Sequence, residues 1–123
     1  HLNPKVQAPV NRILSEVSNV ILIDPLAYQD FIWLMNRSKI IITDSGGLQK
    51  EAYFFKKSCL ILREETEWIE LLPGGHNRLV RPMIESISEK AEEALSSNPD
   101  WSVDLYGDGN SSETIAQAII DHR

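Results

Sequence analysis

A glycine-rich turn between an apolar run and a helical pattern constrains the fold of this chain most. The run Ile40-Ile41-Ile42 leads to Ser45-Gly46-Gly47, and helical spacing follows at once. A strand that passes directly into a helix presents backbone N–H groups at the start of that helix, where anions bind. Glycines there let a ligand approach the backbone closely. The pattern therefore predicts either a phosphate site or plain turn chemistry with Ser45 as the helix cap.

Strand and helix patterns alternate along the rest of the chain. Short apolar runs at 20–23, 40–43, 59–62 and 79–80 predict strands, of which the continuous ones are typical of strands buried on both faces. Residues 1–10 are expected to form a loop, and helices are expected over 11–17, 27–37, 46–55, 67–72, 83–97 and 110–122. This alternation predicts an α/β fold with a parallel sheet and flanking helices.

The spacing of apolar residues predicts which side of each helix faces the core. Asn110 and Glu113 have the spacing of a capping box at the start of the last helix. The residues expected to point inward are Tyr28, Phe31, Leu34 and Met35, then Leu48, Ala52 and Phe55, then Ile84, Ile87, Ala91 and Leu95, and finally Ile115, Ala116 and Ile119.

Composition excludes several classes of function. The net charge of −6 argues against a nucleic-acid partner, since such proteins are usually basic. No apolar run is long enough to cross a bilayer, so no membrane partner is expected. The three histidines lack metal-ligand spacing, and no metal or cofactor is expected. Cys59 lies alone in an apolar run and is expected to be a buried hydrophobe, which fits a reducing compartment.

Three side chains have two interpretations each. Glu51 follows Gly47 by one helical turn and either accepts hydrogen bonds from the two hydroxyls of a ribose or faces solvent. Phe31 is either a core residue or an aromatic contact for a base. Arg63, just past the third apolar run, either faces a phosphate or pairs with a nearby acid.

Several motifs together resemble the non-hydrolysing UDP-N-acetylglucosamine 2-epimerases, and the resemblance covers nearly the whole chain. The late turn Tyr106-Gly107-Asp108-Gly109 and the opening His1-Leu2-Asn3-Pro4 both match. The other matching segments are Asp24-Pro25-Leu26 with Tyr28 and Phe31, Leu34-Met35, Thr43 to Gln49 with Glu51-Ala52, and Leu62-Arg63 with Thr66-Glu67.

The resemblance implies a fold and a set of binding residues. The family has the two-domain GT-B architecture, and this chain resembles most of its C-terminal, UDP-binding half, a single and incomplete Rossmann-like domain over residues 1–123. The implied UDP ligands are Ser45, Gly46 and Gly47 at the diphosphate, Glu51 at the ribose, and Phe31 and the backbone near Leu26 at the uracil. Arg63, Glu67 and Trp68 are further candidates for substrate contact.

The resemblance also implies a reaction for the full-length protein. The family inverts C2 of the sugar by eliminating UDP to a 2-acetamidoglucal and then adding it back. The catalytic acids and histidine are expected in an upstream part, and His1 is not that histidine, so this segment alone is expected to bind but not to catalyse. The full-length protein is expected to be a cytoplasmic homodimer in polysaccharide biosynthesis.

This chain departs from the family pattern in a few places. Trp68 stands where many members have an arginine that contacts the substrate, His76 follows Gly75 where threonine is usual, and Lys50 stands where a second glutamate is common. A tryptophan cannot supply a guanidinium to a diphosphate. Three alternatives therefore remain: an epimerase for a modified sugar such as a UDP-linked acetamido-uronic acid, a related GT-B glycosyltransferase, and a non-catalytic binding module.

Overall fold

A computed structural model describes residues 3–122, so the expected match at His1 and Leu2 lies outside the described residues. By its internal contacts the chain forms two units, which divide between Arg37 and Ser38. The expectation of one domain stays a prediction. Among the described residues, no helix is both long enough and apolar enough to cross a membrane.

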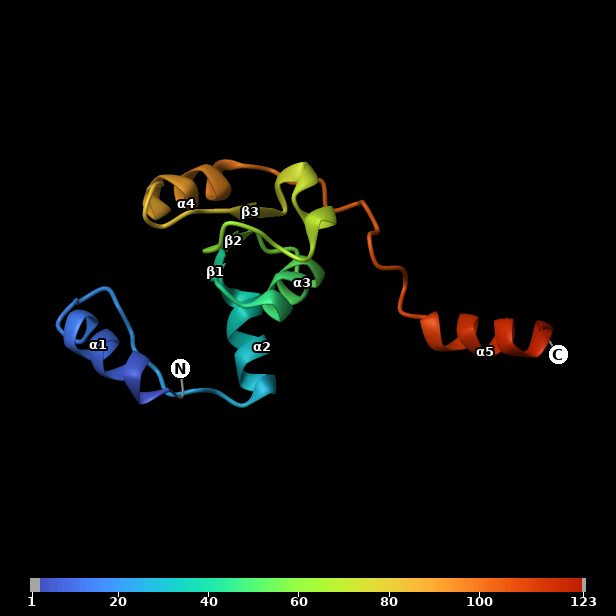
Figure 1. Cartoon of the computed structure of the whole chain (residues 1–123), viewed down its shortest axis with the longest axis horizontal. Helices are drawn as coiled ribbons and strands as arrows, with labels where there is room; N and C mark the ends of the chain where they lie inside the picture. Colours follow the sequence, from blue (N-terminus) through green and yellow to red (C-terminus); the bar gives the residue numbers. More distant parts are fainter. Residues whose placement is uncertain (1–2, 123) are drawn as a thin grey trace. The chain divides into compact units, whose positions relative to one another are not determined.

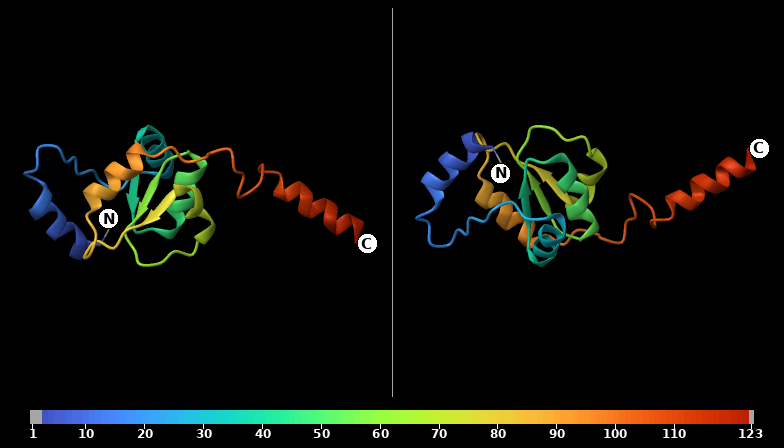
Figure 2. Two further views of the ribbon diagram at one scale, coloured as in Figure 1. Left: turned by 90° about the horizontal axis from the view of Figure 1, so that it is seen from above. Right: turned by 90° about the horizontal axis from the view of Figure 1, so that it is seen from below.

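A parallel sheet forms the centre of the second unit. Its strands are β1 (Ile41–Thr43), β2 (Cys59–Ile61) and β3 (Asn77–Leu79), in that order and all parallel. Helix α3 (Gly46–Phe54) packs on one face and α4 (Ile87–Ser96) on the other (Figures 1 and 2). The predicted α/β class is confirmed.

The side of the sheet that faces α4 holds a small apolar core. Leu60, Val80 and Ala94 are buried there. Ile40, Leu62, Ile87 and Ala91 pack against them. Ile42 pairs in register with Leu60 but lies on the outer strand and is 45% exposed. The prediction that this strand is buried on both faces is therefore wrong, because β1 is the outer strand of the sheet and α4 packs mainly on the central strand β2.

The α3 side of the sheet buries polar groups that apolar periodicity does not reveal. Ala52 is buried as predicted, but Gln49 and Tyr53 are buried as well, while Leu48 and Phe55 are only partly buried. Gln49 Nε2 donates to the Ser45 carbonyl at 3.3 Å. Its Oε1 accepts from the Thr66 hydroxyl. These bonds satisfy the buried amide, which is why a polar residue is tolerated there.

The prediction that Cys59 is buried is confirmed. The residue is 1% exposed on β2, and burial raises the pKa of its thiol to about 12. The thiol therefore stays protonated near neutral pH and acts as a small apolar group.

The start of the chain is helical, contrary to the predicted loop over residues 1–10. Helix α1 spans Pro4–Leu14 and takes in most of the helix predicted over 11–17. The Asn3 side chain accepts from the Lys5 backbone N–H at 3.0 Å. Pro4 occupies the first helical position, where its fixed φ and missing N–H cost nothing. The cap and this proline outweigh the polar composition that favoured a loop.

Residues 20–23 do not form the predicted strand. The segment has no regular structure, and Ile21 and Ile23 are 86% and 56% exposed. An apolar run predicts that a segment prefers burial, but a strand also needs a neighbour to complete its backbone hydrogen bonds. In the first unit no described strand provides one.

Helix α2 (Tyr28–Arg37) lies within the predicted range, but its buried side is narrower than expected. Met35 is buried and Phe31 is partly buried, whereas Tyr28 and Leu34 are exposed.

The elements after β2 shift by a few residues from their predicted places. Short 3₁₀ turns at Ile69–Leu71 and Pro73–Gly75 replace the helix predicted over 67–72, and β3 begins two residues early. Helix α4 begins at Ile87, not residue 83, because the Ser86 hydroxyl caps it by accepting from Glu89 N at 3.3 Å. Ile84 and Leu95, predicted to point inward, are exposed.

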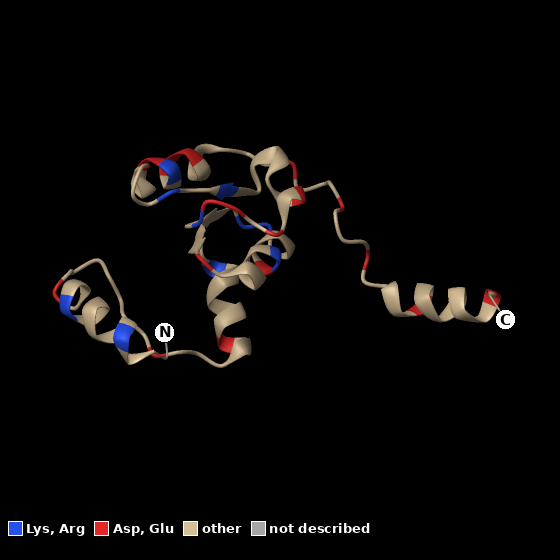
Figure 3. Ribbon diagram, viewed as in Figure 1, with Lys and Arg blue, Asp and Glu red and all other residues tan. Residues whose placement is uncertain are grey.

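The last helix, α5 (Ser111–Asp121), forms where predicted but buries none of its residues. Ile115, Ala116 and Ile119 are exposed, contrary to the predicted core face. The capping box does not form either, because the Asn110 side chain donates instead to Asp108 Oδ2 at 2.9 Å. Acidic side chains occur on α5 and basic ones do not (Figure 3).

Candidate functional site

The glycine-rich turn connects β1 to α3 as predicted. β1 ends at Thr43 and α3 begins at Gly46, with Ser45 at the capping position. The Ser45 backbone N–H donates to the Thr43 hydroxyl at 3.0 Å, while the Ser45 hydroxyl makes no capping hydrogen bond to the helix. The first turn of α3 therefore lacks the side-chain cap that a serine usually provides.

Backbone conformation does not explain why Gly46 and Gly47 are glycines. Neither has a positive φ angle, so the backbone conformation at these positions does not require glycine. A methyl group at Gly47 would meet no atom within 4 Å, and one at Gly46 would lie 3.4 Å from Glu67 Oε2. What remains is the open approach to the backbone that the missing side chains leave.

Arg63 and Glu67 form an ion pair beside this turn. Arg63 NH2 and NH1 donate to Glu67 Oε1 and Oε2 at 2.8 and 3.0 Å. The hydrogen bond from Arg63 lowers the pKa of Glu67. Arg63 follows the carboxyl end of β2, which is parallel to β1, so the pair and the turn share one edge of the sheet. In this structure Arg63 therefore pairs with an acid.

Trp68 fastens the same segment to the start of α3. Its indole N–H donates to the Gly46 carbonyl at 2.9 Å. The Lys50 ammonium lies 3.5 Å from the centroid of the Trp68 ring and 4.5 Å from that of Tyr106. Lys50 and Trp68 thus contact each other through a cation–π interaction.

Tyr106 belongs to the predicted turn and completes this contact. Its hydroxyl donates to Glu70 Oε1 at 2.7 Å, which lowers the pKa of Glu70. Burial, and then Glu70, raise the pKa of Tyr106. Gly107 and Gly109 have φ angles of +79° and +91°, which glycine adopts without strain. The turn is therefore confirmed, and it supports the α3 region from the far end of the chain.

His76 is a buried residue that is hydrogen-bonded to the backbone. The residue is 3% exposed, its Nε2 donates to the Asp100 carbonyl at 2.8 Å, and the Trp101 ring lies 4.8 Å from the His76 ring, centroid to centroid. Across the described residues, no group of three or more His, Cys, Asp or Glu side chains could hold a metal ion.

The remaining expected ligands lie in two places. Glu51 is partly buried on α3, one helical turn after Gly47. In the first unit, Leu26 is 40% exposed just before α2, and Phe31 is partly buried on α2. The roles of these residues at ribose and uracil stay predictions.

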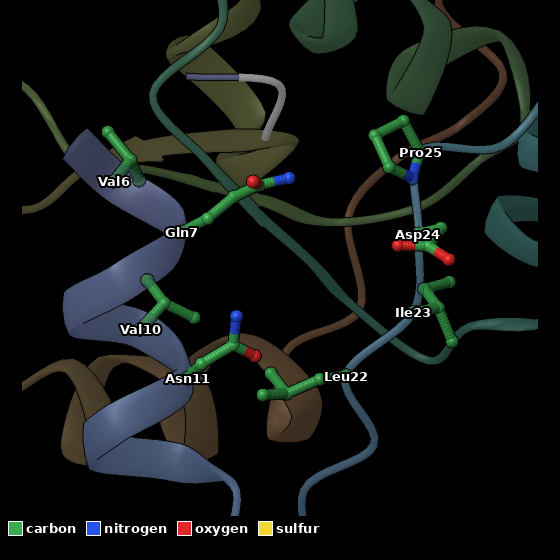
Figure 4. Close-up of a pocket in the computed structure, with 8 residues that line it drawn as sticks. All are labelled: Val6, Gln7, Val10, Asn11, Leu22, Ile23, Asp24 and Pro25. Atoms are coloured by element: carbon green, nitrogen blue, oxygen red, sulfur yellow. The ribbon is translucent and has the colours of Figure 1, made fainter. Parts of the chain in front are cut away.

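The first unit also contains a cavity of about 200 Å³ (Figure 4). Gln7 and Asn11 point from α1 toward the facing segment over 22–25. The cavity is lined by Val6, Gln7, Val10, Asn11, Leu22, Ile23, Asp24 and Pro25. Sequence reasoning missed it because the lining helix was expected to be a loop.

These features define a class of protein: a Rossmann-like α/β fold with a glycine-rich turn that leads from a strand of a parallel sheet directly into a helix. Comparison with protein families makes this specific. A family model described as UDP-N-acetylglucosamine 2-epimerase matches residues 1–120. The chain belongs to the UDP-N-acetylglucosamine 2-epimerase family.

Curated relatives agree with this assignment. The UDP-N-acetylglucosamine 2-epimerase of Escherichia coli is 42% identical over 128 residues, which cover 100% of this chain and 34% of that protein. The UDP-2,3-diacetamido-2,3-dideoxy-D-glucuronate 2-epimerase of Pseudomonas aeruginosa is 40% identical, with 96% and 33% covered. The chain thus spans about a third of the length of these relatives.

Solved structures confirm the predicted fold class, a Rossmann-like sheet of the GT-B kind. UDP-GlcNAc 2-epimerase from Neisseria meningitidis, bound to UDP-GlcNAc, matches 98% of this chain and 34% of its own, with a TM-score of 0.76 and 38% identity. The enzyme from Methanocaldococcus jannaschii, in complex with UDP-GlcNAc and UDP, matches 96% of this chain and 34% of its own, with the same TM-score and 28% identity.

The hydrogen bond from Trp68 to Gly46 generates a prediction for stability. Trp68→Phe keeps an aromatic ring beneath Lys50 but removes the N–H donor, so the free energy of unfolding should fall by about 1 kcal/mol. Trp33→Phe is the matched control, since Arg37 lies 3.8 Å above the Trp33 ring but no described bond uses its indole N–H. Denaturant titration of both variants checks this, and equal losses would show that the bond to Gly46 contributes nothing.

Proposed function

We propose that this chain is the UDP-binding part of a UDP-N-acetylglucosamine 2-epimerase. The observation that carries the proposal is the first turn of α3, which is uncapped by Ser45 and open at Gly47. Such a turn suits a diphosphate, because backbone N–H groups and the helix dipole both favour negative charge there. That the ligand is a UDP sugar is proposed from membership of the family.

The proposed diphosphate ligands are Ser45, Gly46 and Gly47. The two glycines leave the backbone accessible, and the Ser45 hydroxyl, which makes no cap bond, donates to a phosphate oxygen. Glu51 lies one turn further along α3 and accepts hydrogen bonds from the ribose hydroxyls, because helical side chains tilt toward the N-terminus. A carboxylate suits hydroxyl donors and repels phosphate, so these roles divide naturally between the two groups.

The uracil is assigned to the first unit. We place it against Phe31 and the backbone at Leu26, which follows Asp24-Pro25 and precedes α2. Phe31 is partly buried, which leaves part of its ring available to a base.

The whole protein is proposed to invert C2 of UDP-N-acetylglucosamine. UDP leaves C1 as a proton is removed from C2, which gives a 2-acetamidoglucal, and UDP then adds back with a proton on the opposite face of C2. We assign no catalytic group to this chain, whose part is to hold the departing UDP in place. The whole protein is further proposed to be a homodimer.

A second substrate has a specific observation in its favour. Trp68 occupies the place of a substrate-contacting arginine, and the 40% identical relative from Pseudomonas aeruginosa is named for a diacetamido-uronate. An epimerase for a UDP-linked acetamido-uronic acid is therefore the alternative. Product analysis by NMR with both nucleotide sugars separates the two, and sugar transfer to an acceptor would indicate a glycosyltransferase instead.

Calorimetric titration with UDP tests the binding proposal. Ser45→Ala and Glu51→Ala should each raise the dissociation constant roughly tenfold, which corresponds to loss of a hydrogen bond with a charged partner. Ser96→Ala and Glu92→Ala, both exposed on α4, are matched controls and should bind as the parent does. No detectable binding of millimolar UDP to the parent chain would contradict the proposal.

Gly47→Ala should separate stability from binding. The added methyl meets no atom within 4 Å and replaces a flexible helical glycine, so the free energy of unfolding should rise by about 0.5 kcal/mol. The same methyl obstructs close approach of a phosphate to the backbone, so UDP should bind more weakly. Thermal unfolding and calorimetry on the same sample check both effects, and unchanged UDP affinity would exclude Gly47 from the site.

A further inference from the structure

The carboxylate of Glu67 lies where the proposed diphosphate site begins. Its Oε2 would be 3.4 Å from a methyl group placed on Gly46, and Arg63 NH1 would be 4.0 Å from the same position. Both carboxylate oxygens are held by the Arg63 guanidinium. The protein's own anion and its cation therefore lie beside the first residue of α3, in the direction that a side chain at Gly46 would take.

The ion pair between Arg63 and Glu67 is weak enough for another anion to replace Glu67. The side chains of Arg63 and Glu67 are 31% and 54% exposed, and ion pairs that remain in contact with water contribute little to stability. A guanidinium binds a phosphate with the same two-pronged geometry that it offers a carboxylate. Arg63 can therefore leave the Glu67 carboxylate and bind a phosphate with little loss of free energy.

Two anions beside one helix terminus repel each other. A diphosphate at Gly46 and Gly47 would bring its negative charge close to Glu67, and both would compete for Arg63. Asp44 and Glu65 also act electrostatically on Arg63, but Glu67 is the acid that hydrogen-bonds to it. Glu67 is thus the group that a bound diphosphate must displace.

We propose that Glu67 occupies the empty diphosphate site as an internal competitor and that Arg63 changes partner from Glu67 to the diphosphate when UDP binds. The inference rests on the proposed function and gives the Arg63–Glu67 pair a distinct role in it. Glu67 reduces the affinity for UDP. When the nucleotide is absent, Glu67 accepts the hydrogen bonds of the Arg63 guanidinium. Trp68, bonded to Gly46, keeps the backbone of the 66–68 segment in place while the Glu67 side chain moves.

The opposite role for Glu67 makes the opposite prediction. If Glu67 orients Arg63 toward the phosphates and remains paired during binding, its removal weakens UDP binding. The two roles are separated by the sign of the change in affinity on Glu67→Gln, which keeps the size of the side chain and removes its charge.

The experiment is calorimetric titration of the parent chain, Glu67→Gln and Glu93→Gln with UDP and with uridine. Glu93 pairs with Lys90 on α4 and is the control for the change in net charge. Glu67→Gln should tighten UDP binding by up to about fivefold, the range expected for an exposed ion pair, and leave uridine unchanged. Glu93→Gln should leave both unchanged.

A further variant keeps the interpretation unambiguous. Arg63→Gln should weaken UDP binding, and adding Glu67→Gln to it should give no gain, because the competitor and the ligand contend for the same guanidinium. If UDP binds the parent and Glu67→Gln binds it equally or more weakly, the exchange is wrong and the proposed function stands. If neither parent nor variant binds UDP, both fall.

Discussion

The direct passage of β1 into α3 is the constraint on which the rest of the second unit depends. Thr43 ends the strand and Gly46 begins the helix, so only two residues are available to turn the chain. That short turn fixes the start of the helix at the carboxyl edge of the parallel sheet, where α/β folds bind their ligands. The same turn brings the backbone N–H groups at the start of α3, which have no partner within the helix itself, to the edge that also carries Arg63.

Contacts from distant parts of the sequence hold this edge together. Trp68 donates a hydrogen bond to Gly46, and Tyr106 donates one to Glu70. The Lys50 ammonium makes cation–π contacts with the rings of both Trp68 and Tyr106. Thus the segment after β2 and the glycine turn near the end of the chain both brace the same helix. Lys50 and Trp68, two of the positions expected from the sequence to depart from the resembled family, thus contact each other beside the glycine-rich turn.

Sequence patterns predicted the sheet and α3 of the second unit well, but they failed over the start of the first unit and on the packing of α5. The runs at 40–43 and 59–62 and the glycines after Ser45 are local signals, and strands and helix formed within a residue or two of them. The run at 20–23 predicted burial but could not specify a neighbouring strand. Likewise, Ile115 and Ile119 follow helical spacing, yet spacing does not say what packs against them. The bonds of Trp68 and Gln49 depend on tertiary contacts and have no signal in spacing.

The central claim is that the first turn of α3 binds the diphosphate of a UDP compound. The most direct test is a two-dimensional ¹H–¹⁵N NMR titration of the isotopically labelled chain with UDP. The account predicts that the amide signals of Ser45, Gly46 and Gly47 move most, with the Arg63 side-chain signal following them, while amides of α4 stay in place. Shifts confined to other elements, or none at millimolar UDP, would contradict it.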